Sequence, residues 1–79
     1  MKLDYCEQEQ QDGVVIAHVG LQFEDEPDSL YVARVEIGAE GAARLWELYY
    51  NGFDCKYSFS EAEKAALLAY MKEQGVACL

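Results

Sequence analysis

Hydrophobic and polar residues alternate along much of the chain, with the period of two that side chains follow on the two faces of a β-strand. The clearest example is the segment 30–37. Its odd-numbered positions are apolar and would form a core face: Tyr31, Ala33, Val35 and Ile37. Its even-numbered positions mix apolar and charged side chains, so this segment predicts a strand with one face towards the core.

Residues 14–23 are rich in β-branched side chains and predict a second strand. Gly20 interrupts this run, and a glycine inside a strand indicates a bulge or a close approach of another group to the backbone. Residues 2–6 also alternate and are compatible with a short strand, whereas the polar stretch 7–12 is typical of a turn or mobile segment.

The second half of the chain adds two predicted strands. Residues 42–50 allow a short helix, because Ala, Leu and Glu favour one, but a strand is preferred because the Asn51–Gly52 pair that follows is a strong hairpin signal. Residues 53–59 alternate as the return strand. The apolar positions expected to face the core are Trp46, Leu48, Tyr50, Phe53, Cys55, Tyr57 and Phe59, and those expected to face outward include Leu45, Glu47 and Tyr49.

A helix is predicted after residue 60. Ser60 and Glu63 have the spacing of a capping box, and Gly75 stands where a helix ends in a left-handed residue. The expected apolar stripe is rich in alanine, with Leu67 and Tyr70 at its edges: Ala62, Ala65, Ala66, Leu68, Ala69 and Met71. Residues 1–79 therefore predict a single small α+β domain, an antiparallel meander of four to five strands with one C-terminal helix packed on one face.

Charge separates the chain into two parts. The net charge is −9, and residues 1–29 hold eight acids and one base, while the remainder is nearly balanced. Such an acidic surface disfavours direct binding of nucleic acid, because phosphates would be repelled, and it would attract a basic protein surface. Solubility alone needs much less charge than this.

The segment 23–29, FEDEPDS, holds half of these acids and lies between two predicted strands. Its closely spaced carboxylates are the kind of ligand that calcium takes, but the spacing is not that of an EF-hand loop and Pro27 interrupts it. A hairpin loop that meets a basic partner is the preferred interpretation, with an ordinary solvated turn as the alternative. The residues predicted to bind this partner are Glu24, Asp25, Glu26, Asp28, Glu36, Glu47, Tyr49 and Asp12.

No catalytic, cofactor-binding or metal-binding motif is evident, so we expect a protein that is not an enzyme and has no cofactor. The single histidine, His18, and the cysteines Cys6, Cys55 and Cys78 lack the paired spacing of a zinc site. Three widely spaced cysteines predict free thiols. The N-terminus lacks the apolar core of a secretory signal and no run is long enough to span a membrane, so we expect a cytoplasmic protein.

In its size, its charge and the acidic clusters DYCEQEQQD and FEDEPDS, the chain resembles the small phage-encoded inhibitors of bacterial defence, namely the anti-CRISPR proteins and the DNA-mimic anti-restriction proteins. The resemblance is one of class and carries no specific motif. It implies a protein of the host cytoplasm whose carboxylates stand in for phosphates and block a DNA- or RNA-binding groove, for example on a CRISPR effector subunit.

A second hypothesis needs no basic partner. In that case the acids serve solubility only, and the protein is a small accessory domain that associates with itself as a homodimer. Its interface would use the apolar residues expected on the outer sheet face, which are Leu30, Val32, Leu45 and Tyr49.

Overall fold

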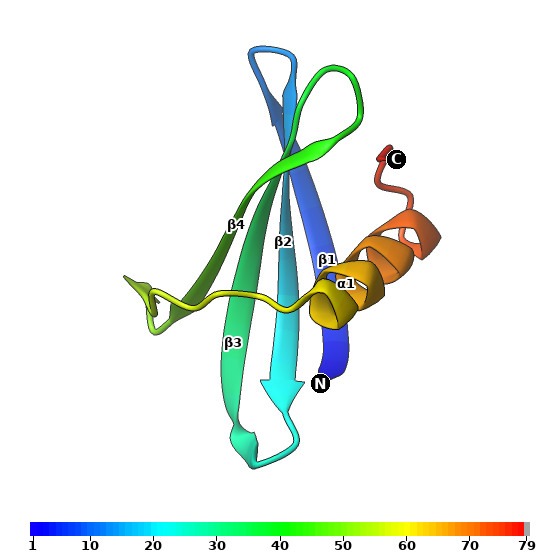
Figure 1. The fold of residues 1–79 in the computed structure, drawn as a ribbon. Coiled ribbons are helices and arrows are strands. Elements are labelled where there is room, and N and C mark those ends of the chain that lie inside the picture. The colour runs from blue at the N-terminus through cyan, green and yellow to red at the C-terminus, as the bar shows by residue number, and fades with distance from the viewer. Residues whose placement is uncertain (79) are drawn as a thin grey trace.

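The computed structural model describes residues 1–78 and shows one antiparallel sheet with a helix on one of its faces (Figure 1). Each strand is hydrogen-bonded to the next along the chain, and α1 (Glu61–Glu73) lies across β1 and β2. This arrangement confirms the predicted α+β meander. The strands are β1 (Lys2–Gln11), β2 (Val14–Phe23), β3 (Glu26–Ile37), β4 (Ala43–Tyr50) and β5 (Phe53–Asp54).

The first strand is longer than the sequence pattern predicts. β1 continues through the polar residues 7–11, which were expected to form a turn, and pairs with β2 until Gln11 lies opposite Val14. A strand at the edge of a sheet needs hydrogen bonds on one side only, and its outer side chains can remain in water. Polar composition therefore does not stop β1; the turn at Asp12–Gly13 does, where both residues adopt positive φ angles of 50° and 79°.

The predicted strand 53–59 is wrong beyond its first two residues. The hairpin at Asn51–Gly52 forms as expected, with φ angles of 51° and 83°, but β5 ends at Asp54. The Asp54 carboxylate accepts a hydrogen bond of 2.8 Å from the backbone N–H of Lys56, and Lys56 itself has a positive φ of 54°. The Cys55 N–H still donates to the Leu48 carbonyl of β4 at 2.8 Å, and beyond this turn the chain leaves β4.

Beyond this turn, residues 55–60 cross the face of β3 and β2 to reach α1 (Figure 1). Of the side chains predicted to face the core, Phe59 is buried, whereas Cys55 and Tyr57 are exposed. Phe53 has 76% of its surface exposed and does not contribute to the core.

Both ends of α1 follow the sequence prediction. The Ser60 hydroxyl accepts a hydrogen bond from the Glu63 N–H at 3.1 Å, and the Glu63 carboxylate accepts one from the Ser60 N–H at 2.8 Å. At the other end Gly75 has a φ of 90°, and the Val76 N–H reaches the Met71 carbonyl at 2.9 Å. This pair of reciprocal bonds and the glycine-based stop fix the length of the helix.

The face of α1 that packs on the sheet differs from the predicted alanine stripe. Leu67 and Met71 are fully buried, with Leu68 and Tyr70 partly buried beside them. Ala62, Ala65, Ala66 and Ala69 are exposed. Burying the longer side chains removes more apolar surface from water than burying alanines, so the helix turns its larger residues towards the sheet.

The core lies between α1 and one sheet face. It contains Leu67 and Met71 from the helix and the buried side chains of the three central strands, namely Ala17, Val19, Leu21, Ala33, Val35, Ile37 and Leu48. The predicted core face of β3 is therefore confirmed, with Tyr31 partly buried at its end. Within residues 1–78 no helix covers the opposite sheet face, and we call it the open face.

Candidate interaction surfaces

The acidic loop, residues 24–28, connects β2 to β3 at the end of the sheet where the chain begins (Figure 1). The reversal itself takes only two residues, Glu24 and Asp25, because Phe23 pairs with Glu26 across it. Pro27 and Asp28 belong to β3, and all five residues are exposed. Glu24 lies 3.6 Å from the terminal amine, and Glu26 accepts a hydrogen bond from the Tyr31 hydroxyl at 3.1 Å.

The other acids of the first third lie along β1. Glu7 and Glu9 stand opposite His18 and Ile16 of β2, so both belong to the open face. All eight acids of residues 1–29 are exposed, and among residues 1–78 only Glu24 of these eight forms an ion pair. The acidic loop and the edge strand therefore present carboxylates with no internal counter-charge other than the terminal amine.

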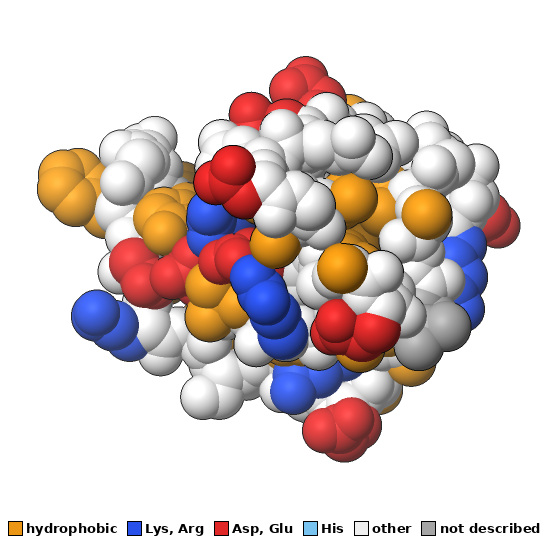
Figure 2. Space-filling view, turned by 90° about the horizontal axis from the view of Figure 1, so that it is seen from above, with side chains coloured by type: hydrophobic (Ala, Val, Ile, Leu, Met, Phe, Trp, Pro, Cys, Tyr) orange, Lys and Arg blue, Asp and Glu red, His pale blue; other side chains and the backbone are white. Residues whose placement is uncertain are grey.

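Asp12 does not join the acidic loop. It lies in the β1–β2 turn at the opposite end of β2, about 30 Å away at ~3.3 Å per strand residue. The molecule is only 35 Å long, so the two sites mark its two ends. Seen from the end opposite the acidic loop, acidic side chains are spread around the outline and several lie beside basic ones (Figure 2).

Glu36, Glu47 and Tyr49 lie on the open face as predicted, but internal partners already engage them. Arg34 Nη1 lies 3.1 Å from a Glu47 oxygen and 3.2 Å from a Glu36 oxygen. The Tyr49 hydroxyl donates to Glu47 at 3.2 Å, and Arg44 lies 3.6 Å from Glu36. Burial opposes the charge on Arg34, but its hydrogen bonds with Glu47 and Glu36 raise its pKa. The centre of this face is therefore balanced in charge.

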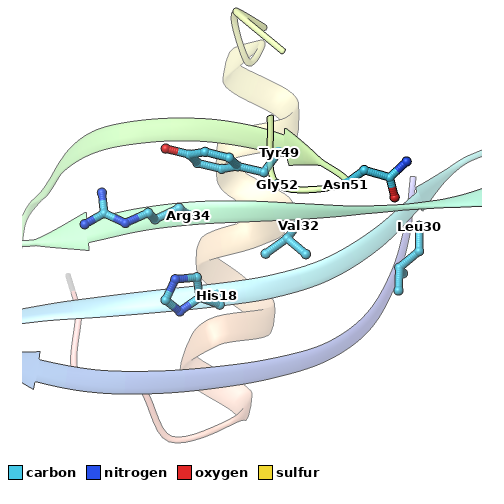
Figure 3. A pocket seen from close by; sticks show the side chains of 7 residues that line it. All are labelled: His18, Leu30, Val32, Arg34, Tyr49, Asn51 and Gly52. Atoms are coloured by element: carbon cyan, nitrogen blue, oxygen red, sulfur yellow. The ribbon is translucent and has the colours of Figure 1, made fainter. Parts of the chain in front are cut away.

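A shallow cavity of about 340 Å³ lies on the open face next to this network. His18, Val32 and Arg34 line it from adjacent strands, with Leu30, Tyr49, Asn51 and Gly52 around them. Figure 3 shows these side chains on the side of the sheet turned away from α1. Leu30 and Leu45 on this face have 43% and 38% of their surface exposed.

A second cavity, also of about 340 Å³, lies on the helix side of the sheet next to the acidic loop. Three aromatic rings line it, from Phe23, Tyr31 and Tyr57, and Leu48 forms part of its floor. Its remaining lining residues are Asp25, Glu26 and Cys55. We call it the aromatic cavity. The sequence pattern does not predict this cavity, because its rings come from β2, β3 and the segment after β5, which only the fold brings together.

The cysteines and His18 do not converge. Cys6 and Cys78 are half-buried beside the core, Cys55 is exposed in the aromatic cavity, and His18 lies on the open face. Within residues 1–78 there is no group of three or more His, Cys, Asp or Glu side chains placed to hold a metal ion. Burial, followed by the neighbouring Cys78 and Glu7, raises the pKa of the Cys6 thiol.

The described helix, α1, has 13 residues and is too short to cross a membrane. No protein-family model, curated protein or solved structure matches this chain.

Proposed function

We propose that this protein is a non-enzymatic inhibitor that places its carboxylates on the basic, nucleic-acid-binding surface of another protein. The observation that supports the proposal is that all eight acids of residues 1–29 are exposed, and that only Glu24 among them has an ion-pair partner in the described structure. Acids that served a structural purpose would be expected to pair with the available bases, as Glu36 and Glu47 do with Arg34.

The arrangement of these acids favours an extended partner surface. The acidic loop lies beside the start of β1, since Lys2 pairs with Gln22 just before the loop. From there Asp4, Glu7 and Glu9 continue along a strand of ten residues. A row of carboxylates on a rigid strand matches a groove lined with Lys and Arg, because that groove has evolved to follow a row of phosphates.

Inhibition would then follow from occupation of the groove, as the resemblance to anti-CRISPR and DNA-mimic anti-restriction proteins implies. The partner class in this proposal is a DNA- or RNA-binding subunit, a CRISPR effector subunit being one example. The protein itself contacts no nucleic acid. Binding should be fast and sensitive to salt, since attraction between opposite surface charges accelerates association and is screened by ions.

The proposal can be tested in two steps. Immobilised protein is used to capture partners from a bacterial lysate, which are eluted with rising salt, and a captured nucleic-acid-binding protein is then titrated by calorimetry. In the test variant the loop acids are neutralised (Glu24→Gln, Asp25→Asn, Glu26→Gln and Asp28→Asn). We expect this variant to bind at least about tenfold more weakly, a loss of ~1.4 kcal/mol. The partner should then bind DNA or RNA in the presence of the variant at a concentration at which the wild type inhibits it.

A matched control replaces four exposed acids elsewhere by their amides (Glu40→Gln, Asp54→Asn, Glu61→Gln and Glu73→Gln), and the asparagine keeps an oxygen acceptor for the Lys56 N–H. It changes the net charge by the same amount and should retain affinity. Equal weakening by both variants would mean that net charge alone acts, and unchanged affinity in the loop variant would contradict the proposal.

Self-association is a second candidate function, and the open face is the observation that favours it. Leu30, Leu45 and Tyr49 surround a charge-balanced centre there, so two copies could meet over β3 and β4, away from Glu7 and Glu9 of β1, with little repulsion despite the net charge of −9. Sedimentation equilibrium over a range of concentrations tests it. A dimer that dissociates in Leu30→Glu or Leu45→Glu, but not in the exposed helix variant Ala66→Glu, would support self-association.

A further inference from the structure

We propose that the aromatic cavity is a binding site for one basic side chain of the partner, and that this side chain is an arginine. The inference rests on the proposed function for its partner class and adds the contact that would give that partner specificity. It is carried by the cavity itself, which combines three aromatic rings with two carboxylates at its rim.

The rings form walls rather than a flat stack. The Phe23 and Tyr31 rings are 5.1 Å apart at 72°, and the Phe23 and Tyr57 rings are 5.6 Å apart at 49°. Ring faces carry negative electrostatic potential, and a cation in the cavity could lie against a ring face that these edge and tilted contacts leave free. The cavity, about 340 Å³ in volume, has room for the end of one long side chain.

The same row of rings already holds a cation at its other end. From Tyr57 it continues through Phe59, 5.1 Å away, to Trp46 at 6.0 Å. There the Lys64 ammonium lies 5.7 Å from the centre of the Trp46 ring. In the described part of the chain no Lys or Arg lies over the Phe23, Tyr31 or Tyr57 rings. Tyr31 also packs against Tyr50, with ring centroids 5.0 Å apart, and the cavity beside these rings is where a cation from outside could enter.

The rim supplies charge. Asp25 and Glu26 form no ion pair within residues 1–78. Glu26 is oriented by the hydroxyl of Tyr31, which donates to both of its oxygens at 3.1 and 3.2 Å. An incoming guanidinium could stack on a ring and donate N–H groups to these carboxylates at the same time, which a quaternary ammonium cannot do because it has no N–H. The carboxylates therefore favour arginine over a trimethylated lysine.

Small probes test the cavity without any partner protein. Backbone amide signals of the ¹⁵N-labelled full chain are followed by NMR during titration with N-acetyl-arginine amide, its neutral isostere N-acetyl-citrulline amide and N-acetyl-trimethyllysine amide. We expect the arginine probe to bind most tightly and to shift signals of Phe23, Glu26, Tyr31 and Tyr57. Equal binding of the citrulline probe would overturn the cation site, and tighter binding of trimethyllysine would overturn the preference for arginine.

Two double variants that lose the same charge separate binding in the cavity from attraction by the overall charge. Asp25→Asn with Glu26→Gln keeps side-chain shape and an acceptor for Tyr31, and it should weaken the arginine probe about tenfold. Glu40→Gln with Glu73→Gln removes the same charge at two exposed positions away from the cavity, and it should leave the affinity for the arginine probe unchanged. Equal weakening by both pairs would show long-range attraction only and would contradict a built site.

Cys55 provides an independent readout, because its exposed thiol lines the cavity. The arginine probe should slow alkylation of Cys55 by iodoacetamide, measured by mass spectrometry of the intact chain and its peptides, and the citrulline probe should not. Absence of protection at a saturating probe concentration would count against the site. These measurements can fail while partner capture succeeds, or the reverse, so the cavity and the proposed function are judged separately.

Discussion

At the scale of single residues, Gly20 and Tyr5 show how the edge strand β1 packs against β2. The two residues face each other across β1 and β2, and a Cβ atom added to Gly20 would overlap the Tyr5 ring. The ring therefore covers the backbone of β2 where the glycine leaves a gap. The register of β1 also shifts between Leu3 and Tyr5, next to this contact.

We predict that Gly20→Ala destabilises the protein by about 1–3 kcal/mol, because the Tyr5 ring must move to make room for the methyl group. Chemical denaturation with urea measures the change in the free energy of unfolding. In a Tyr5→Ala background the same substitution should cost much less. An equal cost in both backgrounds would mean that the ring is not the obstacle.

The thiols of Cys6 and Cys55 should also differ in reactivity. Cys6 is half-buried and its pKa is raised, chiefly by burial, so it holds less thiolate than an unperturbed cysteine, while Cys55 is exposed. We predict that Cys55 is alkylated several times faster than Cys6 near pH 8, as measured by peptide mass spectrometry at short times. Similar rates would contradict the half-buried position of Cys6.

At the scale of elements, α1 shows that the size of the apolar side chains decides which side of a helix packs on the sheet. Alanines and larger apolar residues lie on different sides of this helix, and the larger ones face the sheet. We predict that Leu67→Ala costs about 2–5 kcal/mol of unfolding free energy, because it empties a fully buried position. Ala66→Ser, on the exposed side, should change stability by about 0.5 kcal/mol or less. Thermal and urea denaturation measure the stability of both variants. A larger loss for Ala66→Ser than for Leu67→Ala would mean that the alanine side of the helix faces the sheet.

The capping box predicts a dependence on pH. Burial raises the pKa of Glu63, but the hydrogen bonds from Ser60 and Tyr57 outweigh it, so the folded pKa lies below the usual 4.5. A lowered folded pKa contributes stability that is present above pH 4.5 and is lost as the pH falls through the folded pKa. The stability difference between wild type and Glu63→Gln should therefore be largest near neutral pH and shrink below pH 4. A constant difference down to pH 3 would rule this out.

Most elements could be predicted from local patterns. The cap of α1, the glycine turns and the core face of β3 depend on neighbouring residues, and all are confirmed. The length of β1 and the end of β5 could not be predicted, because β1 depends on pairing with β2 and β5 is stopped by the Asp54 side chain. The acidic loop was evident in the sequence, whereas the aromatic cavity depends on the path of residues 55–60 across the sheet.

At the scale of the whole molecule, uneven charge opposes folding. The acids of residues 1–29 remain exposed and repel one another in the compact state. We predict that the melting temperature rises as NaCl increases from 0.01 M to 0.15 M, where the screening length falls from ~30 Å to ~8 Å. Calorimetric scans would show the rise, and it should be smaller in a variant with Glu7, Glu9 and Asp12 neutralised. A melting temperature that does not depend on salt would argue against this repulsion.

The strict meander order also bears on how the chain folds. Every ladder joins strands that are neighbours in sequence, and the links at Asp12–Gly13, Glu24–Asp25 and Asn51–Gly52 contain only two residues each. Hairpins with such short closures lose little chain entropy and can form one after another. Longer closures follow the meander: the Tyr57 ring packs against Phe23, and α1 docks on β1 and β2, joining the last element to the first two. The sheet can therefore form early, and the core becomes sealed only when the end of the chain arrives.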